Sequence, residues 1–187
     1  MKFKRVIRYG VLLFFLCMIG IIWIYKFQQI NQKYPPAKVE RYSCGKAMEY
    51  DGIQMVVNRA DWISENEIKK NNWNIDTDKR LGDYKILDFK TTITNVSEQR
   101  KTLDLTDFRL EMSGFCNGVS MEAFFIINDE SISSMILNLE KGESVSVHIP
   151  YMLNQVSFTD KYWKNIEQKE AGITVSLYPV KRYMAGI

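Results

Sequence analysis

The sequence predicts an all-β domain, a two-sheet antiparallel sandwich with one or two short helical insertions, preceded by a single N-terminal transmembrane helix. Three observations carry this prediction: an uncharged apolar run near the N-terminus, many stretches that alternate apolar and polar residues, and turn-forming residues between those stretches. The chain has 187 residues. After the anchor is removed, about 160 residues remain, which is enough for one domain with its own core.

The apolar run covers residues 9–25 and contains no charged residue, with Arg8 before it and Lys26 after it. As a helix it would reach about 26 Å, close to the roughly 30 Å of a bilayer's hydrocarbon core. The residues after the run are bulky, and Phe14-Phe15-Leu16 precedes Cys17, so neither a cleavage site nor a lipoprotein signal is recognisable. We therefore expect residues 9–25 to be an uncleaved signal anchor that holds the chain in the membrane.

Basic residues gather at this end of the chain. Residues 1–8 form a basic tail that contains Lys2, Lys4, Arg5 and Arg8. Short basic flanks stay in the cytoplasm, so we expect a single-pass cell-membrane protein with a cytoplasmic N-terminus and an extracellular C-terminal domain. Together with Lys26, these residues leave 20 basic against 22 acidic residues in the remainder. A slightly acidic domain has no electrostatic footprint for nucleic acid, so we expect no nucleic-acid partner.

Residues 26–44 are expected to be a polar stalk that contains proline, and residues 45–187 the extracytoplasmic sandwich. Pro35-Pro36 favours extended backbone and ends a helix that leaves the membrane. Alternation of apolar and polar residues then predicts about seven or eight strands. The clearest stretches are 53–57, 87–93, 103–105, 108–112, 119–125, 135–139, 145–149 and 173–177. Turns are predicted at 95–99, at Asn117-Gly118, and at 140–143, where Gly142 suits a positive φ.

Two stretches interrupt the alternation and predict helical insertions. Ser64 and Glu67 form a capping box that predicts a helix from about residue 65 to 72, and Thr159 can cap one or two further helical turns. Four aromatic residues fall in these insertions: Trp62, Trp73, Tyr162 and Trp163. Exposed aromatic side chains in loops can bind a sugar, a peptide or headgroups. The alternative interpretation is that they cover the open ends of the sandwich.

Three segments of the chain resemble a known family. They are residues 84–99, with a long strand that ends in Thr-Asn, residues 139–147, with a Lys-Gly-Glu hairpin, and residues 175–180. They are similar to immunoglobulin-like domains of unknown function that Gram-positive bacteria carry on lipoproteins and single-pass anchors. The resemblance implies an immunoglobulin-like sandwich at a bacterial cell surface, and it implies no catalytic residues.

Few residues are candidates for chemistry. His148 is the only histidine, and alternation places it on the outward face of its strand, which favours a solvent-facing residue over a catalytic one. Cys44 and Cys116 can form one disulfide in an oxidising exterior, or they can be two free thiols. Asp76 and Asp78 lack the ligands and the glycine of a calcium loop. We expect no catalytic site, no metal and no cofactor.

These observations favour a non-catalytic binding module, tethered to the membrane by its N-terminal helix, with a protein or an envelope component as its partner. Two alternatives stay open at this point. One is an envelope hydrolase that uses a pair of carboxylates, and the other is an accessory or regulatory subunit of a membrane complex.

Overall fold

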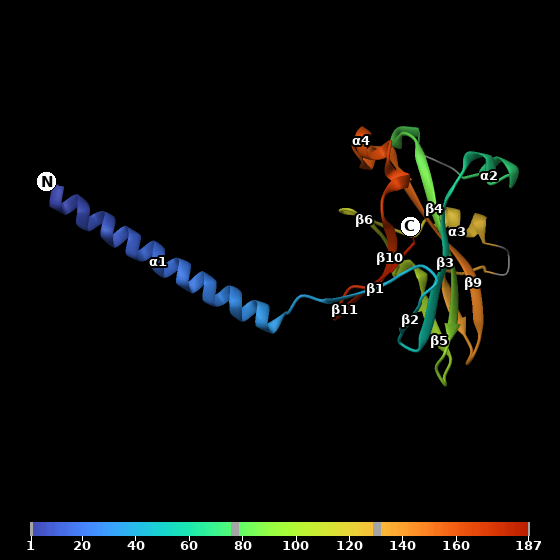
Figure 1. Cartoon of the computed structure of the whole chain (residues 1–187), viewed down its shortest axis with the longest axis horizontal. Coiled ribbons are helices and arrows are strands. Elements are labelled where there is room, and N and C mark those ends of the chain that lie inside the picture. Colours follow the sequence, from blue (N-terminus) through green and yellow to red (C-terminus); the bar gives the residue numbers. More distant parts are fainter. Residues whose placement is uncertain (1, 76–78, 129–131, 187) are drawn as a thin grey trace. The chain divides into compact units, whose positions relative to one another are not determined.

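The computed structural model describes residues 2–75, 79–128 and 132–186 (Figure 1). The chain divides into two compact units, residues Met1–Ala37 and Lys38–Ile187.

The first unit is the helix α1, Lys2–Lys33. Within the described residues it is the one helix that is long and apolar enough to cross a membrane, over Tyr9–Lys33. Its large apolar side chains are exposed, among them Leu13 at 63% and Trp23 at 65%. The helix continues eight residues past the uncharged run, into the predicted stalk, and ends before Pro35-Pro36, where proline prevents its continuation.

The second unit begins earlier than the sequence predicts. Residues Lys38–Tyr42 form strand β1, which pairs in parallel with β11, Val180–Ala185, in the register Lys38 to Val180. The predicted boundary between stalk and domain at residue 44 is therefore wrong. The partner strand lies more than 130 residues away in sequence, so local patterns gave no sign of this pairing.

Two sheets and one small ribbon build the described part of the domain. The five-stranded sheet, which we call sheet A, has the order β1-β11-β10-β6-β7, and the four-stranded sheet B has the order β2-β3-β4-β9. The ribbon pairs β5 with β8. The remaining strands are β2 Ala47–Tyr50, β3 Ile53–Ile63, β4 Tyr84–Asn95, β5 Lys101–Asp104, β6 Arg109–Met112, β7 Phe115–Gly118, β8 Ile136–Leu139, β9 Ser144–Asn154 and β10 Ala171–Ser176.

Short helices connect the strands. They are α2 Glu65–Lys70, α3 Met121–Ile127 and α4 Asp160–Trp163, with the 3₁₀ turns η1 Lys79–Leu81, η2 Leu105–Asp107, η3 Gln155–Ser157 and η4 Ile166–Gln168. Helices α2 and α4 are the two predicted insertions, and they lie at the same end of the domain in Figure 1. The cap of each is confirmed: Ser64 and Glu67 form the capping box, and Thr159 accepts a bond from the backbone N–H of Tyr162.

The inward faces of the two sheets form one hydrophobic core. Phe89 and Tyr151 of sheet B are fully buried with Leu110 and Ile173 of sheet A in a single cluster. The rings of Phe89 and Tyr151 meet edge to face, with their centroids 5.7 Å apart. The predicted two-sheet sandwich is confirmed. It differs from the prediction in its one parallel strand pair and in its additional two-stranded ribbon.

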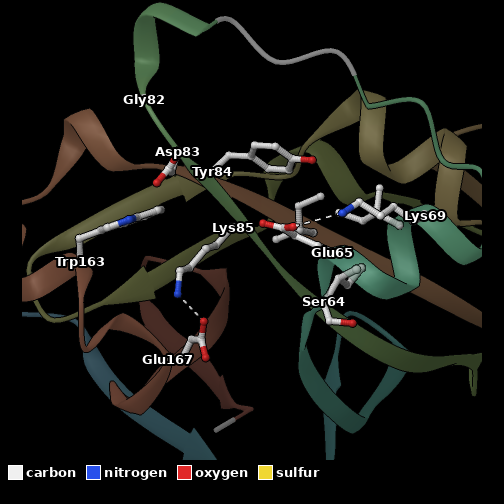
Figure 2. A pocket seen from close by; sticks show the side chains of 12 residues that line it. Ser64, Glu65, Lys69, Gly82, Asp83, Tyr84, Lys85, Trp163 and Glu167 are labelled. Atoms are coloured by element: carbon white, nitrogen blue, oxygen red, sulfur yellow. Dashed lines mark hydrogen bonds and ion pairs between the residues drawn. The ribbon is translucent and has the colours of Figure 1, made fainter.

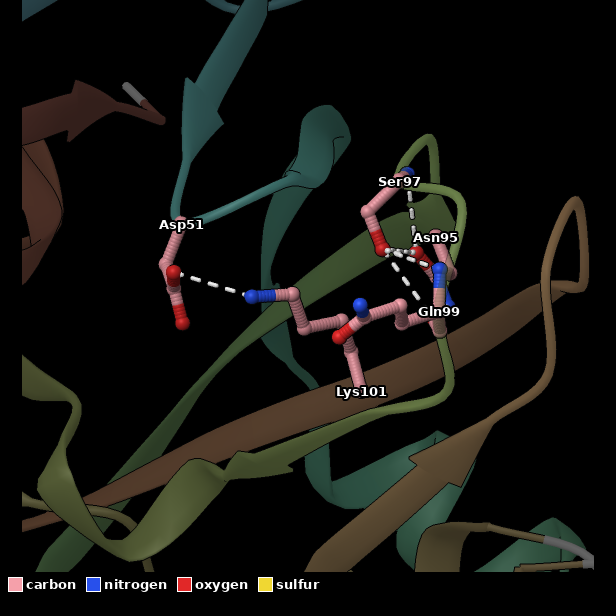
Figure 3. Close-up of polar contacts among 5 residues, drawn as sticks. All are labelled: Asp51, Asn95, Ser97, Gln99 and Lys101. Carbon is pink, nitrogen blue, oxygen red and sulfur yellow. Dashed lines mark hydrogen bonds and ion pairs between the residues drawn. The ribbon is translucent and has the colours of Figure 1, made fainter.

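The turn predicted at residues 95–99 is present and is held by a buried asparagine (Figure 3). Asn95 is 0% exposed. Its side-chain amide donates to the carbonyls of Gln99 and Leu139, each at 2.8 Å, and its Oδ1 accepts from the backbone N–H and the hydroxyl of Ser97. This one side chain therefore replaces the backbone partners that the turn itself lacks.

A second turn beside it was not predicted. Asp51 and Gly52, with φ of 50° and 75°, close the hairpin between β2 and β3, and Lys101 forms a 3.0 Å ion pair with Asp51 (Figure 3). Asp-Gly is the residue pair that a two-residue hairpin with two positive φ angles favours.

The strand predicted at residues 119–125 is wrong, because Met121–Ile127 is the helix α3. Ser120 caps it by accepting from the backbone N–H of Ala123. The predicted turn at Asn117-Gly118 is also wrong. These residues end strand β7, and the turn lies at Gly114, whose φ is 84°.

The tertiary reason is the free edge of β9, the outermost strand of sheet B. Three groups follow that edge and bind its backbone. Asn117 donates to the carbonyl of Met152, the Ser120 N–H donates to that of Pro150, and the Asn128 side chain binds both the N–H and the carbonyl of His148. The segment satisfies the exposed edge without becoming a strand itself.

Candidate functional site

A groove of about 670 Å³ lies at the end of the domain where α2 and α4 are found (Figure 2). It is lined by the following residues: Ile63, Ser64, Glu65, Ile68, Lys69, Gly82, Asp83, Tyr84, Lys85, Ile86, Trp163 and Glu167. The groove thus joins three separate stretches of sequence: the end of β3 with α2, the start of β4, and the α4–η4 segment.

The α2 wall owes its position to the way the chain leaves sheet B. Strand β3 ends at Ile63, where it pairs with Ile86 of β4, and the capping box at Ser64 then starts α2 at once. The helix has no fully buried residue. Ile68 lines the groove, and Lys69 lies 3.6 Å from Glu65, one helical turn away, at the rim.

The start of β4 divides the groove, because successive side chains of a strand point to opposite faces. Tyr84 points toward α2, whereas Lys85 points toward the α4–η4 wall (Figure 2). The ammonium of Lys85 lies 5.7 Å from the centre of the Trp163 ring and forms an ion pair with Glu167. A cation on the face of an indole ring is a favourable contact, so the strand and this wall are held together by both charge and packing.

The charges of the groove are nearly balanced. Each of its two lysines is paired with a glutamate of the groove, Lys69 with Glu65 and Lys85 with Glu167. Asp83 also lines the groove, and no ion pair to its carboxylate occurs within the described part of the chain. The surplus of one carboxylate favours a neutral or positively charged occupant over an anionic one.

The four aromatic residues predicted as a binding surface do not form one exposed patch. Trp163 alone lines the groove, and it is only 7% exposed. The Trp163 ring packs on the ring of Phe158 with a centroid distance of 5.7 Å. The Tyr162 ring also stacks on Phe158, with a centroid distance of 5.5 Å. These contacts make Trp163 and Tyr162 part of the packing that closes this end of the sandwich.

Trp62 and Trp73 come from the first insertion and its flanking strand. Trp62 is in β3 opposite Leu87 and packs half-buried against the core, with its indole N–H buried and unpartnered within the described residues. Trp73 is half-buried, and its backbone N–H donates to the carbonyl of Ile68 at 3.0 Å, at the end of α2.

Tyr84, Lys85 and Glu167 were not predicted as site residues. The available signal was positional, since Tyr84 and Lys85 open the long alternating stretch that directly follows the first insertion. That the second insertion faces the same strand is decided by the topology of the sheets, which the sequence pattern does not contain. Asp76 and Asp78 lie outside the described residues.

Cys44 and Cys116 are free thiols, so the disulfide is not formed in the structure. Cys44 follows β1 and its thiol donates to the carbonyl of Val57 at 3.2 Å, whereas Cys116 lies in β7. Strands β1 and β7 are the two opposite edges of sheet A. Four strand spacings separate them by about 19 Å, whereas a disulfide needs Cα atoms within about 7 Å.

His148 lies on the outward face of sheet B as predicted, but it is not a freely solvated residue. Its Nδ1 is 2.5 Å from Oδ2 of Asp88, and its side chain is 34% exposed. Asp88 is only 8% exposed. In the described part of the chain, no serine hydroxyl and no cysteine thiol forms a hydrogen bond with the imidazole.

No cluster of three or more histidine, cysteine, aspartate or glutamate residues is placed to hold a metal ion within residues 2–75, 79–128 and 132–186. Nothing in the described geometry therefore assigns a metal to the groove or to the Asp88–His148 pair.

Solved structures are similar to this chain at low sequence identity. A conserved hypothetical protein from Bacillus anthracis is similar with a TM-score of 0.50 and 13% identity, over 76% of this chain and 94% of that one. The yjhA protein from Bacillus subtilis gives a TM-score of 0.48 and 13% identity, over 78% and 99% of the two chains. An uncharacterised β-sandwich protein from Clostridium difficile gives 0.44 and 12%, over 80% and 95%.

None of the curated proteins compared with the chain matches it. A family model does match, that of a domain of unknown function, DUF5028, over residues 39–182. These residues include sheet B, the ribbon, the groove and sheet A, except for the first residue of β1 and the last three residues of β11. The chain therefore belongs to the DUF5028 family, whose structural neighbours are uncharacterised β-sandwich proteins of Gram-positive bacteria.

Proposed function

We propose that the protein is a membrane-tethered, extracytoplasmic binding module without catalytic activity, and that the groove between α2, the start of β4 and α4–η4 receives a segment of a partner polypeptide. The observation that carries the proposal is the groove itself, where two insertions from distant parts of the sequence meet at one end of the sandwich. Rigid sandwiches commonly present their binding residues on such connecting segments.

The tether is supported by the exposed apolar surface of α1. A helix that leaves Leu13, Phe14 and Trp23 more than half exposed has no stable place in water. The basic residues that precede the apolar run favour a cytoplasmic N-terminus, and a long domain after a single span is then carried to the outside.

A polypeptide fits the groove better than a sugar does. Sugar sites present an aromatic face to the ligand, but Trp163 is 93% covered by its neighbours, as its 7% exposure indicates. The groove instead offers an apolar floor from Ile63, Ile68 and Ile86, with paired charges at the rim. An apolar side chain of an extended or helical segment fills such a floor, and the lone carboxylate of Asp83 favours a neighbouring lysine or arginine of the partner.

The carboxylates of the groove also favour binding over hydrolysis. A glycosidase needs two carboxyl groups that face one substrate, one of them free to act as an acid. Here Glu65 and Glu167 each hold a lysine of the groove itself, on opposite sides of β4. That leaves Asp83 as the one carboxylate of the groove lining without an ion pair among the described residues, and a second free carboxyl group to act with it is missing from that lining. The proposal predicts no release of sugars or peptides when the purified full chain is incubated with cell-wall material of a Gram-positive host. Release that is lost in a Glu167→Gln variant would establish the hydrolase instead.

The binding surface is tested by photo-crosslinking in living cells. A photoreactive phenylalanine at Tyr84 lies in the groove, whereas the same group at Phe125, an exposed aromatic residue of α3, lies outside it. We expect a discrete adduct with an extracytoplasmic protein from position 84 and none from position 125. An additional Ile68→Glu substitution, which places a charge on the apolar floor, should abolish the adduct. Equal adducts from both positions, or none from position 84, would contradict the proposal.

The same experiment distinguishes the proposed binding module from the remaining alternative, an accessory subunit that acts through its helix. If replacement of residues 9–25 by an unrelated membrane span leaves the Tyr84 adduct unchanged, the helix serves only as a tether. If the adduct disappears while the chain stays in the membrane, the helix itself takes part in recognition.

A further inference from the structure

The hairpin between β10 and β11 presents an unusual apolar turn. Its tip, which we define as Leu177, Tyr178 and Pro179, has Leu177 64% exposed and Tyr178 63% exposed. Turns are normally built from polar residues and glycine, and adjacent exposed apolar residues generally mark a contact surface. Within the described part of the domain, these two are the most exposed large apolar residues that adjoin one another in sequence.

The tip is held in place by its own hydrogen bonds. The hydroxyl of Ser176, just before the tip, donates to the carbonyl of Val180, just after it, at 2.8 Å. Arg182 donates to the same hydroxyl at 3.4 Å. The two apolar side chains therefore project from a closed turn and do not fold back onto the core, which contains neither of them.

The register of sheet A places this tip where the chain enters the domain. Strand β1 runs parallel to β11, and its first residue, Lys38, is opposite Val180, the residue that follows the tip. The groove lies at the other end of sheet A, because the α4–η4 segment leads into the start of β10 and the tip follows the end of β10.

The length of chain between helix and strand limits how far the tip can lie from the membrane. Helix α1 ends at Lys33 and β1 begins at Lys38, so five Cα–Cα steps span at most about 18 Å. From Lys26, the first charge after the apolar run, to Lys33 the helix adds about 10 Å. However the two units are oriented, the chain between them therefore keeps Lys38 within about 28 Å of Lys26.

We infer that the tip Leu177-Tyr178-Pro179 inserts into the interface of the lipid bilayer that holds α1, as a second, non-covalent contact between the domain and the membrane. The residue types fit that place, since tyrosine and leucine partition into the boundary between headgroups and acyl chains. The inference rests on the proposed membrane tether but not on the proposed partner of the groove.

The test uses the full chain reconstituted in phosphatidylglycerol-containing vesicles, with one fluorescent probe on an introduced cysteine. Cys17, Cys44 and Cys116 are first replaced by alanine or serine. The probe is placed at the tip by Tyr178→Cys, or at a matched control position by Val156→Cys. Val156 is 65% exposed and lies in η3, which directly follows β9. The last residue of β9, Asn154, pairs with Tyr84, so Val156 lies at the groove end of sheet B.

We expect headgroup-attached nitroxide lipids to quench the probe at position 178 severalfold more than the probe at position 156. A Leu177→Glu substitution added to the tip variant should bring its quenching down to the control level. Equal weak quenching at both positions in chains that co-float with the vesicles would overturn the tip contact and leave the tether intact. Chains that fail to float with the vesicles would overturn both the tether and the tip contact.

Discussion

The imidazole Nδ1 of His148 on β9 lies 2.5 Å from Oδ2 of Asp88 on β4, on the outward face of sheet B. The direction of this hydrogen bond is set by the tautomer of the imidazole. The other oxygen of Asp88, Oδ1, is buried and has no partner in the described part of the chain. The only histidine of the protein is thus the one described partner of a nearly buried acid.

Removal of the His148 side chain should destabilise the folded domain. We expect His148→Ala to lower the free energy of unfolding by about 1–3 kcal/mol, because it leaves the Asp88 carboxylate buried without a hydrogen bond. Urea unfolding of the full chain in detergent micelles measures the change. Lys90→Ala is the matched control, since Lys90 lies opposite His148 in the register and is exposed. A double-mutant cycle with Asp88→Asn should give a coupling energy above about 0.5 kcal/mol, and additive effects would show that the pair contributes nothing.

Asn95 should be the most sensitive polar residue of the turns. We expect Asn95→Ala to lower the free energy of unfolding by about 2–4 kcal/mol, since it deletes four hydrogen bonds and leaves the Leu139 carbonyl without its amide partner. Asn58→Ala is the control, because its side chain is exposed and makes one bond, to Thr92. If thermal unfolding shows equal losses for both variants, the network in Figure 3 does not hold the turn.

Removal of the Tyr151 hydroxyl, in contrast, should not lower the free energy of unfolding. Its side chain is 0% exposed in the centre of the core, and its hydroxyl has no hydrogen-bond partner within the described residues. Tyr151→Phe keeps the edge-to-face contact with Phe89 and removes a buried, unsatisfied polar group. We expect stability to stay unchanged or to rise by up to about 1 kcal/mol. A loss above that size in denaturant unfolding would reveal a partner for the hydroxyl and contradict the assignment.

The protein should lose stability at alkaline pH because of the buried phenol of Tyr183. Burial raises the pKa of Tyr183 to about 12, the charge of Glu170 adds to the increase, and Arg41 opposes it. Because the pKa in the folded state is above the ordinary value of 10.0, the folded chain favours the neutral phenol. Its contribution is fully present below pH 10 and is lost as the pH rises from 10 to 12, by on the order of 1–3 kcal/mol once screening by solvent is allowed for.

A Tyr183→Phe variant checks this prediction. The difference in unfolding free energy between the variant and the parent chain, followed from pH 9 to 12, should change in favour of the variant by that amount. A pH-independent difference for Tyr183→Phe would mean that the phenol titrates alike in the folded and unfolded chains.

Several parts of the fold were predictable because they depend on neighbours in sequence. The apolar run predicts the helix over Tyr9–Tyr25, the capping box at Ser64 and Glu67 predicts α2, and Lys141-Gly142 predicts the hairpin, where Gly142 has a φ of 75°. In each case the hydrogen bonds or the exclusion from water involve residues a few positions apart. Local composition is then sufficient to specify the structure.

Other parts depend on partners that are distant in sequence. Alternation in residues 119–125 is compatible with a strand, yet the segment is α3, because Asn128 and Ser120 satisfy the free edge of β9. Strand β1 was assigned to the stalk, because only its pairing with the C-terminal strand makes it part of the sheet. The half-buried state of His148 likewise follows from Asp88, sixty residues away.

The sequence by itself determined that this protein is an apolar helix followed by a β-sandwich, since helix length, alternation and turn residues are properties of short segments. The tertiary structure alone decided that β1, which precedes Cys44, and β7, which contains Cys116, are opposite edges of sheet A, and that Tyr84, Lys85 and Trp163 share one groove. It also decided that Leu177 and Tyr178 lie beside the first residue of the domain. The physical reason is that strand order and register are set by packing over the whole core, which no local pattern contains.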